Sequence, residues 1–312
     1  FLIKGNTKIN GEIEVYGSKN AAGAVISAAL LTNEQVVINN VPLVSDILNL
    51  LNILEEMGVM VEWAGPTSRK MIGAANGKLW NCSTEDVVAT QLATGYTVNK
   101  WQTVNFMGRL FGVNGADAPF DYEGTTVSST AWSGSGLTIT NLIHVNVYRS
   151  RLWFVETGTT NAWYGGVQSI TGVLTKFDVG SVARRGGKLL ATWSWSRDSG
   201  NGPSQYIVFV MDTGECMVYY GSDPGFSDFA IVSRFELGSP LTIRSFASFG
   251  PDLLVLTRDG LLPFSQVMSV GYVTQNMAIT QKLGDAVGEV VRQYGATFGW
   301  EVLAYPKGDL LI

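Results

Sequence analysis

The sequence is poor in the residue types on which several functions depend. Lys, Arg, Asp and Glu make up only 15% of the 312 residues, and the net charge is −5. A chain with so few cations has no broad basic surface to neutralise a phosphate backbone, so nucleic acid is not an expected partner. Three basic residues gather at Arg184, Arg185 and Lys188 beside two glycines, and we expect them to form a solvated loop without a functional role.

Histidine and cysteine are almost absent. The chain has one histidine, His144, and two cysteines, Cys82 and Cys216. Two cysteines without CxxC spacing do not make a disulfide framework, and one histidine leaves a Cys/His zinc site incomplete within one chain. We therefore expect no metal and no cofactor. His144 lies in an apolar, strand-like run, where a packed or partly exposed residue without a catalytic partner is expected.

Long hydrophobic runs are missing as well. No stretch of about 18 apolar residues exists, and the start lacks a basic segment followed by an apolar stretch and a cleavage site, so neither membrane insertion nor secretion is expected. The chain begins at Phe1 and stops on the apolar residues Leu310 to Ile312. Both ends are expected to be cut from a longer sequence.

The first 63 residues have the pattern of a small α/β unit. Apolar spacing and turn residues predict, in order, a hairpin over 2–16, a helix over 21–31, a strand over 36–38, a helix after an N-cap at Ser45 that ends before Gly58, and a strand over 59–62. The first helix places Lys19 and Asn20 at its N-terminus. The free N–H groups and partial positive charge of such an end can hold a phosphate or a carboxylate, although a Lys-Asn pair is by itself a weak signal.

Beyond Gly65-Pro66 the helical periodicity is replaced by short apolar runs between turns, and eight of the nine tryptophans lie there. A turn followed by an apolar strand recurs at residues 77–80, 108–111, 150–153, 187–190, 251–254 and 308–311. The spacing is close to that of four-stranded propeller blades. We therefore predict a mainly β, β-propeller-like repeat domain preceded by a small α/β unit, with one helical insertion over about 281–294.

A resemblance adds to this reading of the first segment. The stretch Gly17 to Ala22, followed by Ala28 to Leu31, Asn40 to Pro42, Ser45-Asp46 and Leu54 to Val59, resembles the N-terminal unit of the UDP-N-acetylglucosamine 1-carboxyvinyltransferases, enolpyruvyl transferases of peptidoglycan biosynthesis. The resemblance implies an enolpyruvyl transferase fold of six α/β repeats in two domains. It also implies that Lys19 and Asn20, which match the family's Lys-Asn pair, bind substrate.

The departures from that family argue against catalysis. The similarity covers about residues 1–63, one repeat of six, and Gly23-Ala24 replaces a larger apolar residue and proline. The family's mobile loop, with a reactive cysteine among glycines followed by an arginine, has no counterpart, because Cys82 stands in Asn81-Cys82-Ser83-Thr84-Glu85. No catalytic residue is therefore assigned. Without the other repeats the chain cannot close a cleft around a transition state.

The second segment resembles β-propeller virion proteins of bacteriophages and prophages. The resemblance is carried by residues 113–117, 151–156, 193–200, 214–215 and 219–224. It implies a chimeric chain with a partial transferase-like unit over 1–63 and a phage-type propeller over 66–312 that continues past Ile312. The expected function is non-catalytic, structural or binding, with virion or tail proteins or a surface glycan as partners and a virion-associated location.

The alternative is an active enolpyruvyl transferase. It would use phosphoenolpyruvate and UDP-N-acetylglucosamine, would be cytoplasmic, and would work only if the missing repeats are supplied by another chain.

Overall fold

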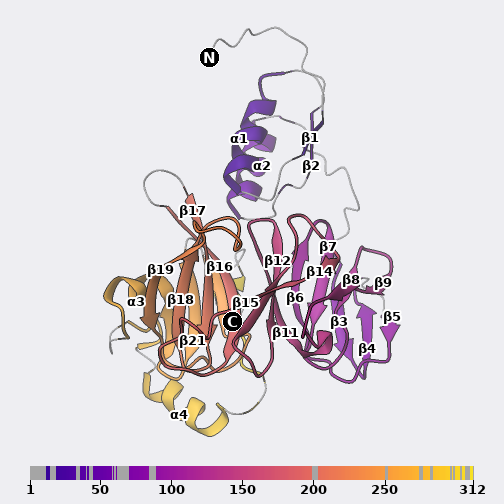
Figure 1. Cartoon of the computed structure of the whole chain (residues 1–312). Helices are drawn as coiled ribbons and strands as arrows, with labels where there is room; N and C mark the ends of the chain where they lie inside the picture. Colours follow the sequence, from indigo (N-terminus) through magenta and orange to yellow (C-terminus); the bar gives the residue numbers. More distant parts are fainter. Residues whose placement is uncertain are drawn as a thin grey trace. The chain divides into compact units, whose positions relative to one another are not determined.

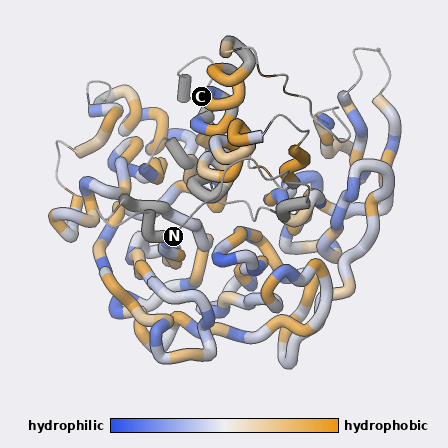
Figure 2. Tube along the Cα trace, turned by 90° about the horizontal axis from the view of Figure 1, so that it is seen from above, coloured by the Kyte–Doolittle hydropathy of each residue, from blue (hydrophilic) through white to orange (hydrophobic). Residues whose placement is uncertain are grey.

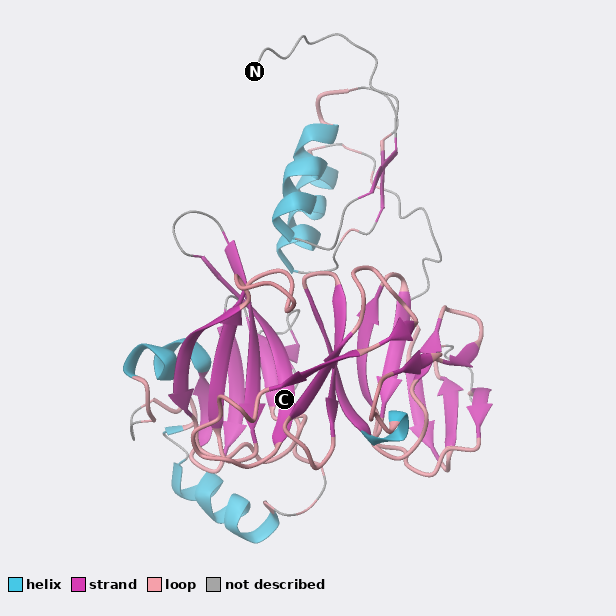
Figure 3. Ribbon diagram, in the orientation of Figure 1, coloured by secondary structure: helices cyan, strands magenta, loops and turns pink. Residues whose placement is uncertain are grey.

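In the computed structural model the chain divides into two compact units. One comprises residues 1–71 with 83–85, and the other comprises residues 72–82 with 86–312. The structure describes residues 12–14, 19–32, 36–39, 41, 45–57, 59, 61, 70–83, 89–198, 203–249, 252–273, 277–281, 284–295, 297, 299–302, 304–305 and 310–311. Figure 1 traces the chain from indigo to yellow, and Figure 3 separates helices from strands.

The first unit, here the α/β unit, contains two helices and a pair of short strands. In chain order these are β1 (Glu12–Glu14), α1 (Lys19–Ala29), β2 (Val37–Asn39) and α2 (Ser45–Glu56). The helices pack through the buried side chains of Ala22, Ile26, Ile47 and Leu54. Ala22 and Ile26 are one helical turn apart, and Ile47 and Leu54 are two turns apart with the partly buried Leu50 and Leu51 between them, so each helix presents one apolar face, as the sequence pattern predicted.

The strands of the α/β unit differ from the prediction. β1 pairs with β2 in parallel, Glu12 opposite Val37, a pairing that the sequence analysis did not predict; the rest of the predicted hairpin, residues 2–11 and 15–16, lies outside the described residues. Val59 and Val61 are not in a strand, and the rest of the predicted strand 59–62 lies outside the described residues. A parallel pair needs a crossover, and α1 supplies it.

Gly23 lies in the middle of α1, where glycine disfavours the helix. A methyl group added there would meet only the Ile47 side chain, at 3.8 Å. Glycine costs a helix interior about 0.5–1 kcal/mol relative to alanine, so we expect Gly23→Ala to stabilise the α/β unit by about that amount. Urea unfolding followed by helical circular dichroism measures the change. A destabilised Gly23→Ala variant would contradict the packing described here.

The second unit, here the repeat unit, is built from consecutive antiparallel sheets. The described residues form five sheets of three or four strands, each made of strands that follow one another in the chain, except that β14 (Gly172–Val173) lies between the last two strands of the third sheet. The first sheet holds β3 (Ile72–Ala75), β4 (Lys78–Asn81) and β5 (Thr90–Thr94); the second holds β6 (Gln102–Phe106), β7 (Arg109–Val113), β8 (Phe120–Tyr122) and β9 (Val127–Ser129); the third holds β11 (Leu142–Tyr148), β12 (Arg151–Glu156), β13 (Asn161–Tyr164) and β15 (Thr175–Asp178); the fourth holds β16 (Leu189–Asp198), β17 (Pro203–Met211), β18 (Glu215–Tyr220) and β19 (Ala230–Glu236); the fifth holds β20 (Phe246–Phe249), β21 (Asp252–Thr257) and β22 (Gly260–Pro263).

Smaller elements accompany these sheets. They are β10 (Trp132–Ser133), which pairs in parallel with β14 (Gly172–Val173), the short 3₁₀ turn Ile139–Asn141, the helices α3 (Phe264–Val270) and α4 (Gly284–Tyr294), and the pair β23 (Ala304–Tyr305) and β24 (Leu310–Leu311). The predicted helix over 281–294 is confirmed by α4. The sequence analysis missed α3, because a seven-residue helix directly after a strand leaves little helical periodicity to detect.

A hydrophobic core lies between each sheet and the next. Adjacent residues of one strand enter different cores: on β17, Ile207 and Phe209 pack toward the third sheet, whereas Val208 and Val210 pack toward the fifth. β12 divides in the same way, with Leu152 toward the second sheet. Figure 2, which looks along the strands, shows the apolar residues in orange. Sheets that are covered on both faces explain why these strands are continuous apolar runs rather than alternating ones.

The order of the sheets and of the cores between them gives the repeat unit a β-propeller-like fold. The first strands of successive sheets are neighbours, since β11 contacts both β6 and β16. Each sheet therefore places its first strand on the inside and its later strands further out, as propeller blades do. The predicted fold class, mainly β with a small α/β unit in front, is confirmed.

The recurring turn motif marks the hairpin between the first and second strands of a sheet. Both central residues have positive φ in three successive sheets: Asn76 (53°) and Gly77 (68°), Met107 (50°) and Gly108 (71°), and Arg149 (48°) and Ser150 (56°). Two successive positive φ angles define the type I′ turn, whose twist matches that of the strands it joins. The repeat in the sequence is thus a repeat of hairpin geometry.

One copy of the predicted turn motif does not form a hairpin within a sheet. Residues 187–190 lead into β16, the first strand of the fourth sheet, and so form the connection between two sheets rather than a hairpin. Gly187 has a φ of 92°, and a methyl group there would lie 2.3 Å from the Asp212 carboxylate, so both the backbone conformation and the lack of space require glycine. A glycine before an apolar strand can therefore belong to a hairpin within a sheet or to a connection between sheets. This explains why the copies of the motif are unevenly spaced in the sequence.

Candidate functional site

The residues predicted to bind substrate lie at the start of α1. The helix begins at Lys19, with Asn20 as its second residue, so the predicted N-terminal position is confirmed for the backbone. The side chains of both residues lie outside the described residues. Their proposed role as substrate contacts stays a prediction.

Cys82 follows β4 and is half-buried. Its Sγ lies 3.8 Å from the carbonyl oxygen of Trp80, and a methyl group on Gly73 would approach the same sulfur to 3.0 Å. The thiol therefore packs against the neighbouring strand of the first sheet.

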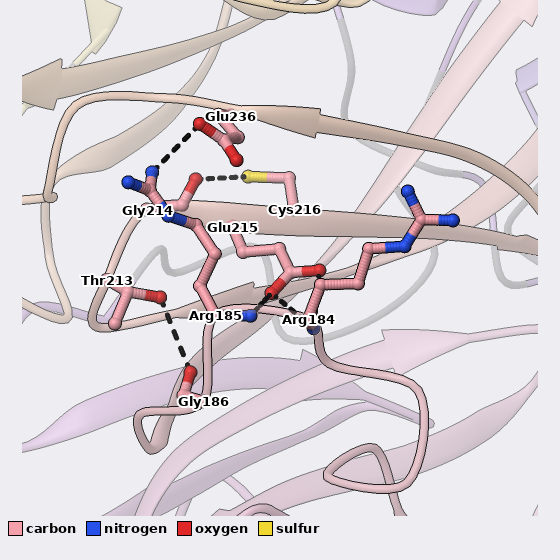
Figure 4. Close-up of polar contacts among 8 residues, drawn as sticks. All are labelled: Arg184, Arg185, Gly186, Thr213, Gly214, Glu215, Cys216 and Glu236. Atoms are coloured by element: carbon pink, nitrogen blue, oxygen red, sulfur yellow. Dashed lines mark hydrogen bonds and ion pairs between the residues drawn. The ribbon is translucent and has the colours of Figure 1, made fainter.

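The basic loop of Arg184 and Arg185 is anchored by a buried carboxylate, shown in Figure 4. Glu215 is 2% exposed and accepts hydrogen bonds from the backbone N–H groups of Arg184 (2.9 and 3.0 Å) and Arg185 (2.9 Å). The Arg185 guanidinium pairs with Glu236 at 2.8 Å, with both side chains about half exposed. Glu215 holds the connection between the third and fourth sheets against β18, so the loop has a structural role.

Cys216 lies beside this carboxylate and is fully buried. Its Sγ is 3.7 Å from the carbonyl oxygen of Gly214. Burial, with a smaller contribution from the Glu215 charge, raises the pKa of the Cys216 thiol well above its ordinary value. The thiolate is the reactive form of cysteine, so Cys216 is inert at neutral pH.

We expect Glu215→Ala to destabilise the repeat unit by about 1–3 kcal/mol, because it leaves partly buried backbone donors of the basic loop without an acceptor. The matched control is Glu236→Ala, which removes the exposed partner of Arg185 and is expected to cost less than about 1 kcal/mol. Denaturant unfolding of both variants gives the two values. Equal costs would show that the Glu215 carboxylate does not anchor the loop.

The first strands of four sheets are joined by a series of side-chain contacts, here the inner-strand contacts. The amide nitrogen of Gln102 lies 3.4 Å from Nε2 of His144, the His144 ring is 5.7 Å from the Trp193 ring, and the Trp193 ring is 5.7 Å from Phe246. The Arg244 guanidinium donates to the carbonyl oxygen of Trp101, next to Gln102. These contacts bring β6, β11, β16 and β20 together on the inside of the repeat unit.

His144 is packed within these contacts. It is 1% exposed, and burial lowers its pKa from 6.5 to about 3, so the imidazole is neutral at ordinary pH. An amide nitrogen can only donate, so Nε2 accepts from Gln102 and the ring proton belongs on Nδ1, which has no partner among the described residues. The prediction of a packed histidine is confirmed, and no carboxylate is seen to orient the ring for catalysis in the described part of the chain.

A second group of residues gathers at the opposite ends of these strands from the basic loop. Tyr220, the last residue of β18, is 41% exposed, and its ring centroid lies 5.5 Å from that of Tyr206. The guanidinium carbon of Arg149, in the β11–β12 turn, lies 5.8 Å from the centre of the Tyr220 ring. Phe226, in the loop after β18, is 69% exposed. We call the three residues that these contacts join, Arg149, Tyr206 and Tyr220, the tyrosine–arginine surface.

The loop that carries Phe226 is fixed by side chains of the third sheet. The hydroxyl of Tyr148 donates to the carbonyl oxygen of Gly221 at 2.7 Å, and Arg151 pairs with Asp223 at 2.6 Å. Arg151 is itself buried. Sequence reasoning missed this surface because Arg149 and Tyr220 are far apart in the chain. The adjacent tyrosines at 219–220 before a glycine were the signal available.

The described residues show neither a metal cluster nor a membrane-spanning helix. Among them, no cluster of three or more His, Cys, Asp or Glu side chains is arranged to hold a metal ion. None of the described helices has both the length and the apolar character needed to cross a membrane.

Comparison with known proteins supports the family resemblance of the first segment only. The family model of EPSP synthase (3-phosphoshikimate 1-carboxyvinyltransferase) matches residues 3–97. This match runs past the predicted boundary at residue 63 and includes the strands of the first sheet.

Curated relatives are UDP-N-acetylglucosamine 1-carboxyvinyltransferases. That of Elusimicrobium minutum is 46% identical over 68 residues, 22% of this chain and 16% of the relative. That of Gluconobacter oxydans is 40% identical over 73 residues, 23% of this chain and 18% of the relative. Enzyme 2 of Latilactobacillus sakei is 34% identical over 111 residues, 36% of this chain and 24% of the relative. The chain thus spans less than a quarter of the length of each of these three enzymes.

Solved structures with some likeness to the chain include a calcium-binding regucalcin from Agrobacterium tumefaciens. It has a TM-score of 0.41 at 16% identity, covering 61% of this chain and 65% of that one. A putative 6-phosphogluconolactonase from Bacteroides uniformis also has a TM-score of 0.41, at 14% identity, covering 65% of this chain and 66% of that one. Sequence match and sheet order together describe a chain that joins an enolpyruvyl transferase-like N-terminal segment to a β-propeller-like repeat unit.

Proposed function

We propose that this chain is a non-catalytic binding or structural protein of the bacteriophage or prophage type, whose enolpyruvyl transferase-like segment is not competent for transfer. The observation that carries the proposal is the change of architecture at Ile72: from there on, the chain forms successive antiparallel sheets. Enolpyruvyl transfer depends on groups that are held in place around the reacting atoms. A single α/β unit does not provide the second side of the cleft that such a site needs.

The proposal includes the partners and the location. Virion or tail proteins, or a surface glycan, are the proposed partners, and association with the virion is the proposed location. Mass spectrometry of purified phage particles from a host that carries this gene tests the location. Absence of the chain from the particles, while it is present in the cells, would contradict this part of the proposal.

The second candidate is an active enolpyruvyl transferase that obtains its missing repeats from another chain. The match of residues 3–97 to the EPSP synthase family model favours it. Under this candidate the substrates are phosphoenolpyruvate and UDP-N-acetylglucosamine, and Lys19 and Asn20 contact them.

A coupled assay of phosphate release from phosphoenolpyruvate and UDP-N-acetylglucosamine separates the two candidates. We expect no release above the rate without protein. Turnover that disappears on Lys19→Ala, but persists on Arg292→Gln in α4 of the repeat unit, would establish the transferase and overturn the proposed function.

A further inference from the structure

We propose that the tyrosine–arginine surface binds a carboxylated oligosaccharide. The inference rests on the proposed binding function and names the class of ligand and the residues that would take it. Tyr220 is 41% exposed, and Arg149 places a cation beside its ring.

The first argument concerns the aromatic rings. Tyr220 is tilted by 51° against Tyr206, so the two rings support each other, and Tyr220 remains 41% exposed. Aromatic side chains provide a large, rigid contact area that loses little conformational entropy on binding. A pyranose ring has a face of C–H groups that fits flat against such a side chain.

The second argument concerns charge. Among the residues that the structure describes, Arg149 forms no ion pair and its Nε is buried without a hydrogen-bond partner; its side chain hydrogen-bonds the uncharged Tyr148 side chain. The nearby Arg151, in contrast, is paired with Asp223. A guanidinium binds a carboxylate through two parallel N–H donors, so Arg149 selects a ligand that carries a carboxylate.

The third argument concerns rigidity and shape. The hydrogen bond from Tyr148 to Gly221 and the Arg151–Asp223 ion pair fix both ends of the segment before Phe226. The surface therefore exists before the ligand arrives, which reduces the entropic cost of binding. Because turns and strand ends form it, it offers a peptide no open sheet edge for strand addition, which favours a sugar over an acidic peptide.

The test compares three soluble probes of six units by isothermal titration calorimetry. Hexagalacturonate carries the carboxylates, maltohexaose is a neutral hexasaccharide, and hexaglutamate carries the charge without the sugar rings. We expect the full chain to bind hexagalacturonate and to bind the other two at least about tenfold more weakly. Equal binding of maltohexaose or hexaglutamate, or no binding of hexagalacturonate, would overturn the inference.

Variants assign the binding to this surface. Arg149→Asn removes the cation and suits a residue with positive φ, and we expect it to weaken hexagalacturonate binding about tenfold. Tyr220→Ala should have a similar effect, whereas Tyr220→Phe keeps the ring and should retain binding, which separates loss of stacking from loss of folding. The matched control is Arg184→Asn, an exposed arginine at the other ends of the strands, which should bind as the unchanged chain does. Unchanged binding by Arg149→Asn and Tyr220→Ala would place the ligand elsewhere.

This result is distinguishable from the test of the proposed function. If the chain shows no transferase turnover and does not bind hexagalacturonate, only the ligand class inferred here is wrong. If the chain shows transferase turnover, the proposed function is wrong, whichever probe the chain binds.

Discussion

Trp153→Ala is expected to lower the free energy of unfolding of the repeat unit by about 3–5 kcal/mol, the typical cost of removing a fully buried aromatic side chain. Trp153 is 0% exposed and lies in the core between the third and fourth sheets. Its ring centroid is within 5.0–5.9 Å of four other aromatic rings, those of Tyr164, Phe177, Phe209 and Phe229. The variant leaves a cavity that rigid sheets cannot close completely.

Guanidinium chloride unfolding, followed by far-UV circular dichroism, measures this loss. The matched control is Trp80→Ala on the first sheet, where the ring is only half-buried and its Nε1 donates to Ala75 at 3.3 Å. We expect Trp80→Ala to cost clearly less. If the two variants lose the same stability, Trp153 does not hold the third and fourth sheets together as described.

His144 is expected to make the repeat unit sensitive to acid. Its pKa is about 3 in the folded chain, lowered by burial, and about 6.5 in an unfolded chain. The unfolded state therefore binds the proton first as the pH falls. The stability linked to the neutral ring is fully present above pH 6.5 and is lost progressively as the pH falls toward 3, by about 3 kcal/mol at pH 4.

The comparison of His144→Gln with the unchanged chain isolates this contribution from that of the carboxylates, which titrate in both proteins. Between pH 7 and pH 4 the unchanged chain should lose about 3 kcal/mol more than the variant. Asn146→Ala, on the same strand, is the control that changes packing without removing a titrating group. The difference in stability between this variant and the unchanged chain should not depend on pH. Because His144 is the single histidine, nuclear magnetic resonance of its ring follows the protonation directly. A ring that becomes charged near pH 6 in the folded protein would refute the burial argument.

The sequence predicted those parts of the fold that depend on neighbouring residues. The apolar runs at Leu79, Leu110 and Leu152 each follow a tight turn, and each lies on the second strand of a sheet. The run at Leu189 follows a similar glycine but starts a first strand, because a glycine can serve a hairpin or a connection between sheets. α3 could not be found, since its seven residues follow β22 without a break.

The candidate sites depended on contacts between distant residues, and here the sequence was of less use. Lys19 and Asn20 were found because they are adjacent and precede a helix. The buried position of Glu215, 30 residues beyond the Arg185 backbone it anchors, has no local signature. The same holds for Arg149 and Tyr220, which only the packing of the third sheet on the fourth brings together.

The division of strands such as β12 and β17 between two cores has a consequence for how such a chain can change in length. A gene can gain or lose one whole sheet and still leave the neighbours with a matching apolar face to cover, because every sheet presents the same kind of surface on both sides. A break inside a sheet, for example between Phe209 and Met217, would leave half of two cores open to water at once. Viable junctions between unrelated genes should therefore fall at the connections between sheets.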